Sequence, residues 1–365
     1  MSFKVFKWSD ADAPSFDTSK GSLIELLEKC LVTGYGSGEE ETLPPDPAWS
    51  VEKSADGLHA VFWSNGTHPD ATGHYFYVRD DGEVDGDPAG DDVLEHGREA
   101  YIQGALDFTG WTDGKPDLTD KFPQPGSMAR GAVWEKRDDT GYSTNPSWVV
   151  IADSRTVYVT MGNYRDGGSD SANFADSSAA FAYGLRAFGD LRPLSDEPGG
   201  TSFISGGDTY NNTSNPAWGG GHILDRATHD GVVCSFNHGG GVGGQLRSYD
   251  ETGDGYCYEN RPARYPTDLT DLTPPLFELP YLKHIDGGEG MSAALMAMRG
   301  IKQPSLDFDG DDDECNYFFY TLVGLQQGDP LMAHIDMGGK SRFAIYSDSA
   351  GFNDTVCFFD LEDDS

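Results

Sequence analysis

Basic residues are scarce in this sequence, and their shortage excludes one class of partner. Lysine and arginine together number 25, against 61 aspartates and glutamates, which gives a formal net charge of -36. Proteins that hold nucleic acid through its phosphates use clustered lysine and arginine, and no such basic patch occurs here. We therefore expect no nucleic-acid partner.

Long hydrophobic runs and cysteine pairs are also missing. No run of 18 apolar residues occurs, and residues 1–8 lack the apolar core of a signal peptide, so we expect no membrane span. The cysteines include no Cys-x-x-Cys pair, which argues against a zinc site, and their odd number leaves at least one thiol free in a monomer. The five cysteines are Cys30, Cys234, Cys257, Cys315 and Cys357.

Carboxylates, by contrast, are abundant enough to indicate the solvent for which the protein is suited. In low salt a net charge of -36 repels itself and opposes the compact state. At molar salt the Debye length falls to roughly 3 Å, so a dense carboxylate surface stays hydrated without repelling itself. We interpret the charge as that of a halophilic source, with an acidic protein of ordinary cytoplasm as the alternative.

This interpretation predicts that stability depends on salt. We expect the midpoint of thermal unfolding to fall as NaCl is lowered from molar to ~0.1 M, where the Debye length grows to about 10 Å and the carboxylates repel one another. Thermal melts across a NaCl series measure the effect. A midpoint that does not change with salt would contradict the halophilic interpretation.

Glycine (47 residues), proline (20) and aromatic residues (12%) are typical of many short strands joined by turns. We predict a mainly β fold, a β-sandwich or mixed antiparallel sheets, with one N-terminal amphipathic helix. Residues 148–161 predict a central hairpin, because two β-branched runs flank the polar corner Asp153-Ser154-Arg155. The first run is apolar on consecutive residues, which indicates a strand covered on both faces. Further strands are predicted at residues 3–8, 59–63, 74–79, 131–136, 231–236, 317–325 and 341–346.

The helix is predicted at residues 22–33. Ser22 and Glu25 have the spacing of a capping box, in which each side chain caps the first turn. A short second helix is predicted at residues 291–299. The residues that recur on one face of the first helix, where a thiol would be buried and unreactive, are Leu23, Leu26, Leu27, Cys30 and Leu31.

The chain is long enough for two domains. We divide it into a β-rich domain at residues 1–195, which contains the helix at 22–33, and a second β-rich domain at residues 196–365. No repeat of fixed period and no obvious linker marks this boundary, and a single unit is the alternative.

Sequence motifs identify no catalytic or cofactor-binding site. Residues 239–244 formally match the Gly-x-Gly-x-x-Gly of dinucleotide-binding loops, but the residues that follow look extended rather than helical, so we interpret them as a loop. His222, His229 and His238 would bind a metal only if their loops converged. The usual hydrolase motifs do not occur, while a carboxylate pair for glycoside cleavage has no fixed spacing and stays open. We assign no catalytic and no cofactor-binding residue.

The sharpest candidate for a metal site is the acidic stretch at residues 306–314. Asp307, Asp309 and Asp311 alternate along the chain, and a turn at Gly310 would let them converge on Ca²⁺ or another hard cation. The spacing is not that of an EF-hand. A solvated acidic loop is the alternative. Residues 80–92, the other acidic stretch, are predicted to form a solvated loop.

Seven segments follow one another in a recognisable order. They are residues 22–36, 75–81, 148–158, 188–190, 244–249, 275–285 and 298–304. In this order they resemble a family of uncharacterised virion proteins of tailed bacterial viruses. The chain departs from the family by acid-rich insertions and lacks the apolar and histidine residues expected just after Pro304, so the region 304–316 stays unassigned.

Joined to the halophilic charge, the resemblance implies a structural protein, not an enzyme, of a haloarchaeal tailed virus. It would be assembled in the host cytoplasm and be extracellular in the mature virion. Two places fit: the head exterior, as a vertex turret or decoration protein, and the tail, as a tail or baseplate component. The expected partners are other virion proteins and further copies of the chain in a cyclic homo-oligomer. A host-surface partner, through a glycan-binding adhesin or glycan hydrolase, is a third alternative.

Overall fold

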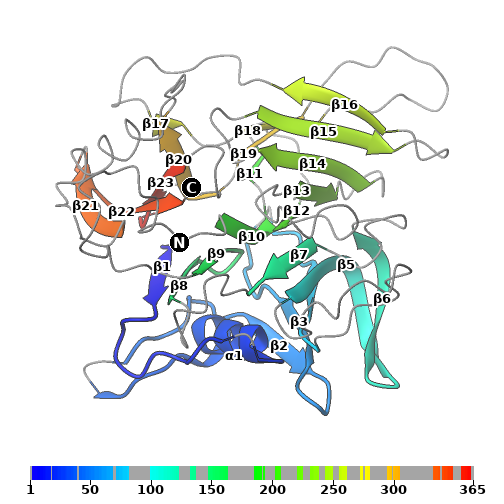
Figure 1. Ribbon diagram of the computed structural model, residues 1–365, viewed down its shortest axis with the longest axis vertical. Helices are drawn as coiled ribbons and strands as arrows, with labels where there is room; N and C mark the ends of the chain where they lie inside the picture. Colours follow the sequence, from blue (N-terminus) through cyan, green and yellow to red (C-terminus); the bar gives the residue numbers. More distant parts are fainter. Residues whose placement is uncertain are drawn as a thin grey trace, which may run out of the picture.

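The structure, a computed structural model of the chain, is built mainly from antiparallel β-strands. This confirms the predicted fold class. The described strands form four sheets, and one helical segment near the N-terminus packs against them (Figure 1). The structure describes residues 2–17, 19–38, 41–68, 71–81, 99–122, 132–136, 147–162, 185–190, 192–193, 202–206, 220–224, 231–237, 243–249, 255–260, 272–273, 276–279, 294–297, 299–304, 332–337, 339–347 and 355–362.

The largest sheet has nine strands and contains the predicted hairpin. β8 (Ser147–Ala152) and β9 (Thr156–Gly162) pair in antiparallel register, and β1 (Lys4–Lys7) pairs with the other side of β8. Residues 148–152 are all buried, so both the hairpin and its covered first strand are confirmed. Beyond β9 the strands follow in the order β10 (Leu185–Asp190), β12 (Ser202–Gly206), β13 (Gly220–Leu224), β14 (Gly231–Asn237), β15 (Gly243–Tyr249) and β16 (Gly255–Asn260).

The second sheet comes from the first third of the chain. Its order is β2 (Ser50–Lys53), β3 (His59–Trp63), β4 (Tyr75–Arg79), β5 (Glu99–Thr112) and β6 (Lys115–Phe122), and β7 (Ala132–Glu135) also pairs with β5. The strands predicted at 59–63, 74–79 and 131–136 are therefore confirmed. β5 and β6 form a long hairpin that extends at one side of the molecule (Figure 1).

An aromatic core joins these two sheets. The ring of Phe188, on β10, lies 5.0 Å from that of Phe76 on β4 and 5.7 Å from that of Trp49, measured between centroids. Trp134, on β7, lies 5.8 Å from the same ring. All four side chains are at most 1% exposed. Because the alternate residues of β3, β4 and β5 that face inward are apolar, the two sheets pack face to face as a sandwich.

Two smaller sheets complete the described part of the chain. One has the order β17 (Leu272–Thr273), β20 (Ile301–Pro304), β23 (Thr355–Asp360), β22 (Lys340–Ser347) and β21 (Met332–Met337); the other has the order β11 (Arg192–Pro193), β19 (Ala294–Ala297) and β18 (Leu276–Leu279). The helix predicted at residues 291–299 is wrong, because β19 pairs on both sides. A short apolar run has no periodicity to separate helix from strand, and neighbouring strands decide. The strand predicted at 317–325 lies outside the described residues.

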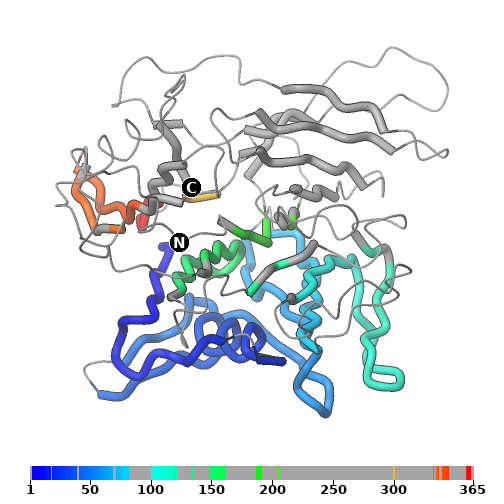
Figure 2. The backbone as a smooth tube through the Cα atoms, viewed as in Figure 1, coloured from blue at the N-terminus to red at the C-terminus, as the bar shows by residue number. Residues whose placement is uncertain are grey.

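The first and last described residues lie side by side. The amide of Phe3 donates a hydrogen bond of 3.1 Å to the carbonyl of Leu361, and Ser2 forms a β-bridge with Glu362. The first strand therefore lies beside the sheet that contains the last strand (Figure 2). The nine-stranded sheet likewise takes strands from both sides of residue 195. Segments distant in the sequence thus share sheets and edges.

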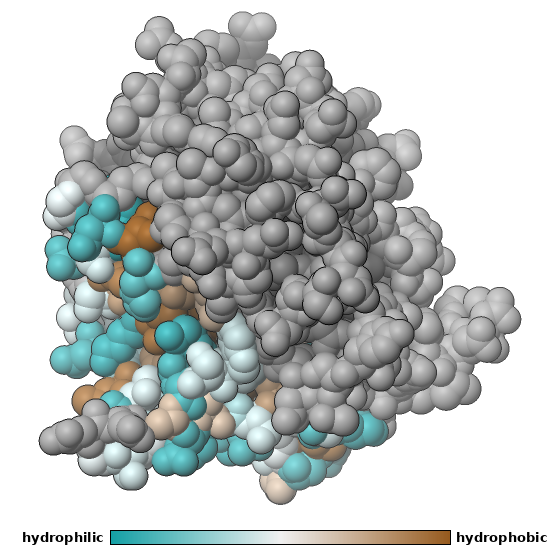
Figure 3. Space-filling view, turned by 60° about the vertical axis from the view of Figure 1, so that its left-hand side comes forward, coloured by the Kyte–Doolittle hydropathy of each residue, from teal (hydrophilic) through white to brown (hydrophobic). Residues whose placement is uncertain are grey.

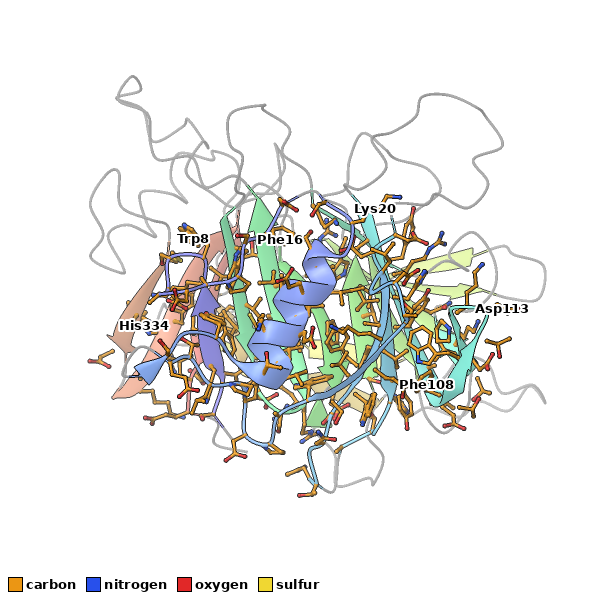
Figure 4. The ribbon with its side chains drawn as sticks, turned by 90° about the horizontal axis from the view of Figure 1, so that it is seen from below. Trp8, Phe16, Lys20, Phe108, Asp113 and His334 are labelled. Atoms are coloured by element: carbon orange, nitrogen blue, oxygen red, sulfur yellow. The ribbon has the colours of Figure 1, made fainter. Side chains whose placement is uncertain are left out.

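The predicted helix is present, with a different N-terminus. It begins as α1 (Ser22–Glu28) and continues as a π-helical turn, η1 (Lys29–Thr33), lying in front of the strands in Figure 4. The capping box is wrong: the N-cap is Gly21, no side-chain cap forms there, and the hydroxyl of Ser22 donates to the carbonyl of Asp17. The thiol of Cys30 is fully buried as expected, and burial raises its pKa.

The buried face of α1 can be tested with a small deletion. Ile24 is 2% exposed and belongs to the main hydrophobic core. Ile24→Val removes one buried methyl group and is expected to lower the free energy of unfolding by about 0.5–1.5 kcal/mol. Chemical denaturation at constant high salt measures the change. Glu25→Gln, at an exposed position of the same turn, serves as the control, and an equal effect of the two would contradict the packing.

Candidate functional site

The polar corner of the central hairpin is buried. The carboxylate of Asp153 accepts hydrogen bonds from the amides of Arg155 (2.8 Å) and Thr156 (2.7 Å), which closes the turn between β8 and β9. Residues 153–156 are at most 2% exposed. A short aspartate that bonds to the backbone two or three residues ahead is a common way to build such a turn. Here the turn places a carboxylate and a guanidinium inside the protein.

Arg299, 146 positions further along the chain, neutralises the charge of Asp153. Its Nη1 donates to Oδ1 of Asp153 at 3.0 Å, and its Nη2 lies 2.7 Å from Oδ2, so the guanidinium lies against both carboxylate oxygens. The hydroxyl of Tyr158, on β9, donates to the carbonyl of Arg299 at 2.6 Å. Arg299 immediately precedes Gly300 and β20. The contact therefore fastens the C-terminal sheet to the central hairpin.

Asp190, at the end of β10, forms a second ion pair with the same turn. Nε of Arg155 donates to its Oδ2 at 3.0 Å, and the hydroxyl of Thr72 donates to its Oδ1 at 2.6 Å. Burial raises the pKa of the Asp190 carboxyl, while the hydrogen bond from Thr72 and the charge of Arg155 act in the opposite direction. Thr72 belongs to the segment before β4, so its hydrogen bond to Asp190 joins the two sheets of the sandwich.

A serine and a histidine meet next to this pair. Nδ1 of His74 is hydrogen-bonded to the hydroxyl of Ser202, which is the partner of Asp190 in the β10–β12 ladder. A histidine beside a serine is the arrangement that activates a nucleophile in many hydrolases. Ser202 is 0% exposed and His74 is 2% exposed. In this conformation the contact holds the residues before β4 against the large sheet, and the hydroxyl faces no open surface.

A third buried pair lies at the start of α1. Nζ of Lys136, just after β7, lies 2.5 Å from Oδ1 of Asp80, just after β4, and both side chains are 0% exposed. The other carboxylate oxygen, Oδ2, accepts a hydrogen bond of 2.9 Å from the amide of Leu23. Nζ also donates to the carbonyl of Ser19 at 2.6 Å and lies 3.3 Å from the hydroxyl of Ser22. The helix that lacks a local cap is thus capped by distant residues.

The acidic stretch 80–92 is therefore not simply a solvated loop. Asp80 and Asp81 are buried, and Nε of Arg79 donates to Asp81 at 2.8 Å. Burial raises the pKa of Asp80 to about 6, against the opposing charge of Lys136, and burial lowers the pKa of Lys136. The remaining residues of the stretch lie outside the described part. The error arose because composition alone does not reveal that a distant lysine will neutralise a particular aspartate.

One pattern unites these contacts. Each buried carboxylate among the described residues lies against a lysine or arginine. The pairs are Asp80 with Lys136, Asp81 with Arg79, Asp153 with Arg299, Asp190 with Arg155 and Asp360 with Arg342. Buried charges are tolerated only when they are paired and hydrogen-bonded. We call residues 72–74, 153–156, 188–190, 202 and 299–300 the buried junction, because their contacts join the sheets.

An aromatic row marks the surface near the β5–β6 hairpin. Ring contacts run from Trp63 to Tyr75, on to Phe108 and then to Trp111, with centroids 5.7, 5.9 and 5.8 Å apart. All four side chains are half-buried. Nε1 of Trp111 donates to the carboxylate of Glu52, on β2, at 2.7 Å. Figure 4 shows Phe108, which lies on β5 of this hairpin, at the outer part of the molecule. Half-buried rings beside a carboxylate offer both an apolar and a polar contact to a partner.

Most of the candidate metal-binding residues named from the sequence lie outside the described part of the structure. Asp307, Asp309 and Asp311 lie outside the described residues, as do His229 and His238. His222 lies on β13, and its side chain lies outside the described part. The residues after the glycine-rich stretch 239–244 are extended, as predicted, because β15 begins at Gly243. Within the described ranges no three histidine, cysteine or acidic side chains are grouped to hold a metal ion.

Comparisons with protein-family models, with curated proteins and with solved structures gave no match. Within the described residues, no helix has the length and apolar character needed to cross a membrane. The function must therefore be inferred from the residues and their geometry.

Proposed function

We propose that this chain is a structural protein of a haloarchaeal tailed-virus particle, located on the head exterior as a vertex turret or decoration component. It acts by assembly with other virion proteins and with copies of itself in a closed ring. A place in the tail or baseplate is the alternative. In this role the protein is a rigid body whose surface contacts the neighbouring virion proteins.

The observation that carries the proposal is the position of the buried junction in the sequence. Three of the segments that resemble virion proteins contain charged or glycine residues of the buried junction: residues 148–158, 188–190 and 298–304. A fourth, residues 75–81, directly follows its residues 72–74. The Asp153–Arg299 contact joins positions 146 apart, and the Thr72–Asp190 contact joins positions 118 apart. The resembling segments are distant in the sequence and come into contact only in the folded protein. This supports a fold shared with the virion proteins rather than a chance similarity of composition.

The described surface suits the same role. Hydrophilic side chains cover most of the described part of the face in Figure 3, with smaller hydrophobic patches between them. With a net charge of -36, such a surface remains hydrated in molar salt. The long β5–β6 hairpin, whose turn residues Asp113 and Gly114 both have positive φ (51° and 79°), projects a stiff element for contacts.

The proposal is tested on purified particles. Washed virions are dissociated, and the chain is quantified by mass spectrometry against the major capsid protein. Copies in proportion to the five-fold vertices or to the whole capsid support the head location, whereas a few copies per particle move the protein to the tail. Absence from washed particles would defeat the structural proposal.

The aromatic row favours a second candidate function, that of a glycan-binding adhesin. Half-buried tryptophans beside a carboxylate can offer an apolar ring face and a polar group to a sugar. Binding to host-surface glycans is measured with the whole protein at molar salt. Trp111→Ala should abolish such binding and Thr112→Ala, at the exposed neighbour, should not. Equal binding by both variants would exclude the aromatic row as the glycan site.

A further inference from the structure

We propose that Lys136 and Asp80 are joined by an intramolecular isopeptide bond between Nζ and Cγ. The two side chains are fully buried and their nearest polar atoms lie 2.5 Å apart. Such a bond would be a covalent modification of the fold itself. It does not depend on the virion function proposed above.

The two residues are held in place by the sheet. β4 and β7 both pair with β5: Tyr101 lies opposite Arg79 of one strand and Val133 of the other. The strand ends that carry Asp80 and Lys136 are therefore fixed on the two sides of the start of β5. Reactive groups held in contact by a rigid scaffold gain a large advantage over the same groups in free solution.

The polar neighbours fit the amide product as well as the ion pair. The carbonyl of Ser19 already accepts a hydrogen bond from Nζ at 2.6 Å, and the amide of Leu23 already donates to Oδ2 at 2.9 Å. In the product, the amide N–H keeps the first partner and the amide oxygen keeps the second. Two buried charges disappear, and the hydroxyl of Ser22, which loses its contact with Nζ, still donates to the carbonyl of Asp17. The product therefore removes the desolvation cost of the ion pair.

The reaction requires both groups in their neutral forms. Burial raises the pKa of Asp80 to about 6 and lowers the pKa of Lys136, and the charge of Asp81 raises the pKa of Asp80 further. A proton passes from Nζ to Oδ1 across their contact. The lone pair of Nζ then attacks Cγ, and the charge that develops on Oδ2 faces the amide of Leu23.

The step balances without a co-reactant. The Nζ–Cγ bond forms and the Cγ–Oδ1 bond breaks. Oδ1 leaves as water, carrying the proton of the carboxylic acid and one proton from Nζ. An acid and an amine thus give an amide and one water molecule, with no oxidation or reduction. The bond closes a ring between residues 56 positions apart and, like a disulfide, restricts the unfolded chain.

A second, exposed lysine–carboxylate pair in the same protein serves as a control for the isopeptide bond. Lys53 and Glu28 form an ion pair of 2.6 Å, nearly the same distance, but their side chains are 38% and 23% exposed. Water reaches both groups, so this contact lacks the desolvation that favours replacing a buried ion pair by an amide. We expect this pair to remain unlinked in the same molecules in which Lys136 and Asp80 are linked.

The test is the mass of the full-length chain, folded at molar salt and then denatured. The expected mass is lower than that of the sequence by one water molecule, and a protease digest should contain a branched peptide joining Lys136 to Asp80. Lys136→Arg should show the full sequence mass. Asp80→Asn should lose ammonia instead of water and give the same linked product as the wild type.

Three outcomes would overturn the proposal. One is a wild-type chain at full sequence mass. A second is water loss that the digest places elsewhere, for example as a cyclic imide at an Asp-Gly sequence, with Lys136 and Asp80 in separate peptides. The third is the same water loss in Lys136→Arg. Because the wild-type measurement decides by itself, a variant that folds poorly does not remove the test.

Discussion

Replacing Arg299 with alanine is expected to lower the free energy of unfolding by about 3–5 kcal/mol, because it leaves the buried carboxylate of Asp153 without its cation. Asp153 is 0% exposed, and both of its oxygens lie within 3.0 Å of the guanidinium. The C-terminal sheet would also lose its attachment to the central hairpin. Denaturant unfolding at constant molar salt measures the change, so that screening of the surface charge is the same for every variant.

The matched control is an exposed ion pair. Lys53→Ala breaks the contact with Glu28, whose two side chains are 38% and 23% exposed, and should cost less than about 1 kcal/mol. A double replacement, Asp153→Asn with Arg299→Met, should recover part of the loss, since no buried charge then remains. If Arg299→Ala costs no more than Lys53→Ala, the buried junction is not what holds the sheets together.

Gly189→Ala is expected to have the other large effect. Gly189, on β10, has φ of +132°, and a Cβ there would lie 2.3 Å from the carbonyl oxygen of Arg155 and 2.6 Å from Cα of Thr156. Both contacts are with backbone, which cannot turn away as a side chain could. The strained φ contributes about 1–3 kcal/mol and the forced shift of the β8–β9 turn contributes about 1–3 kcal/mol more.

A second glycine separates these two contributions. Gly110, on β5, has nearly the same φ, +137°, and a Cβ at that position would meet nothing within 4 Å. Gly110→Ala should therefore show only the backbone strain, and the difference between the two variants measures the close approach of β10 to the turn. Equal losses of unfolding free energy would show that β10 does not pack on the turn as closely as the structure places it.

The sequence determined the local elements of the described fold. β-branched runs on both sides of a polar corner predicted the hairpin of β8 and β9, and the apolar spacing of residues 22–33 predicted the helix. These signals are local, since a strand or helix face is set by residues a few positions apart. Two inferences from the sequence stay predictions: the division into two domains, and the metal site at Asp307, Asp309 and Asp311.

Only the tertiary structure decided where the charges inside the protein lie. The partner of Asp153 is 146 positions away, and Asp80, read from composition as part of a solvated loop, caps α1 and meets Lys136. Residues 294–297 are a strand because β18 and β11 flank them. A buried charge and a short apolar run take their state from groups that folding brings into contact. The fold class follows from local sequence patterns. The buried junction and the pair of Asp80 and Lys136 depend instead on contacts between residues distant in the sequence. These charges are paired because an unpaired charge in the protein interior costs too much free energy.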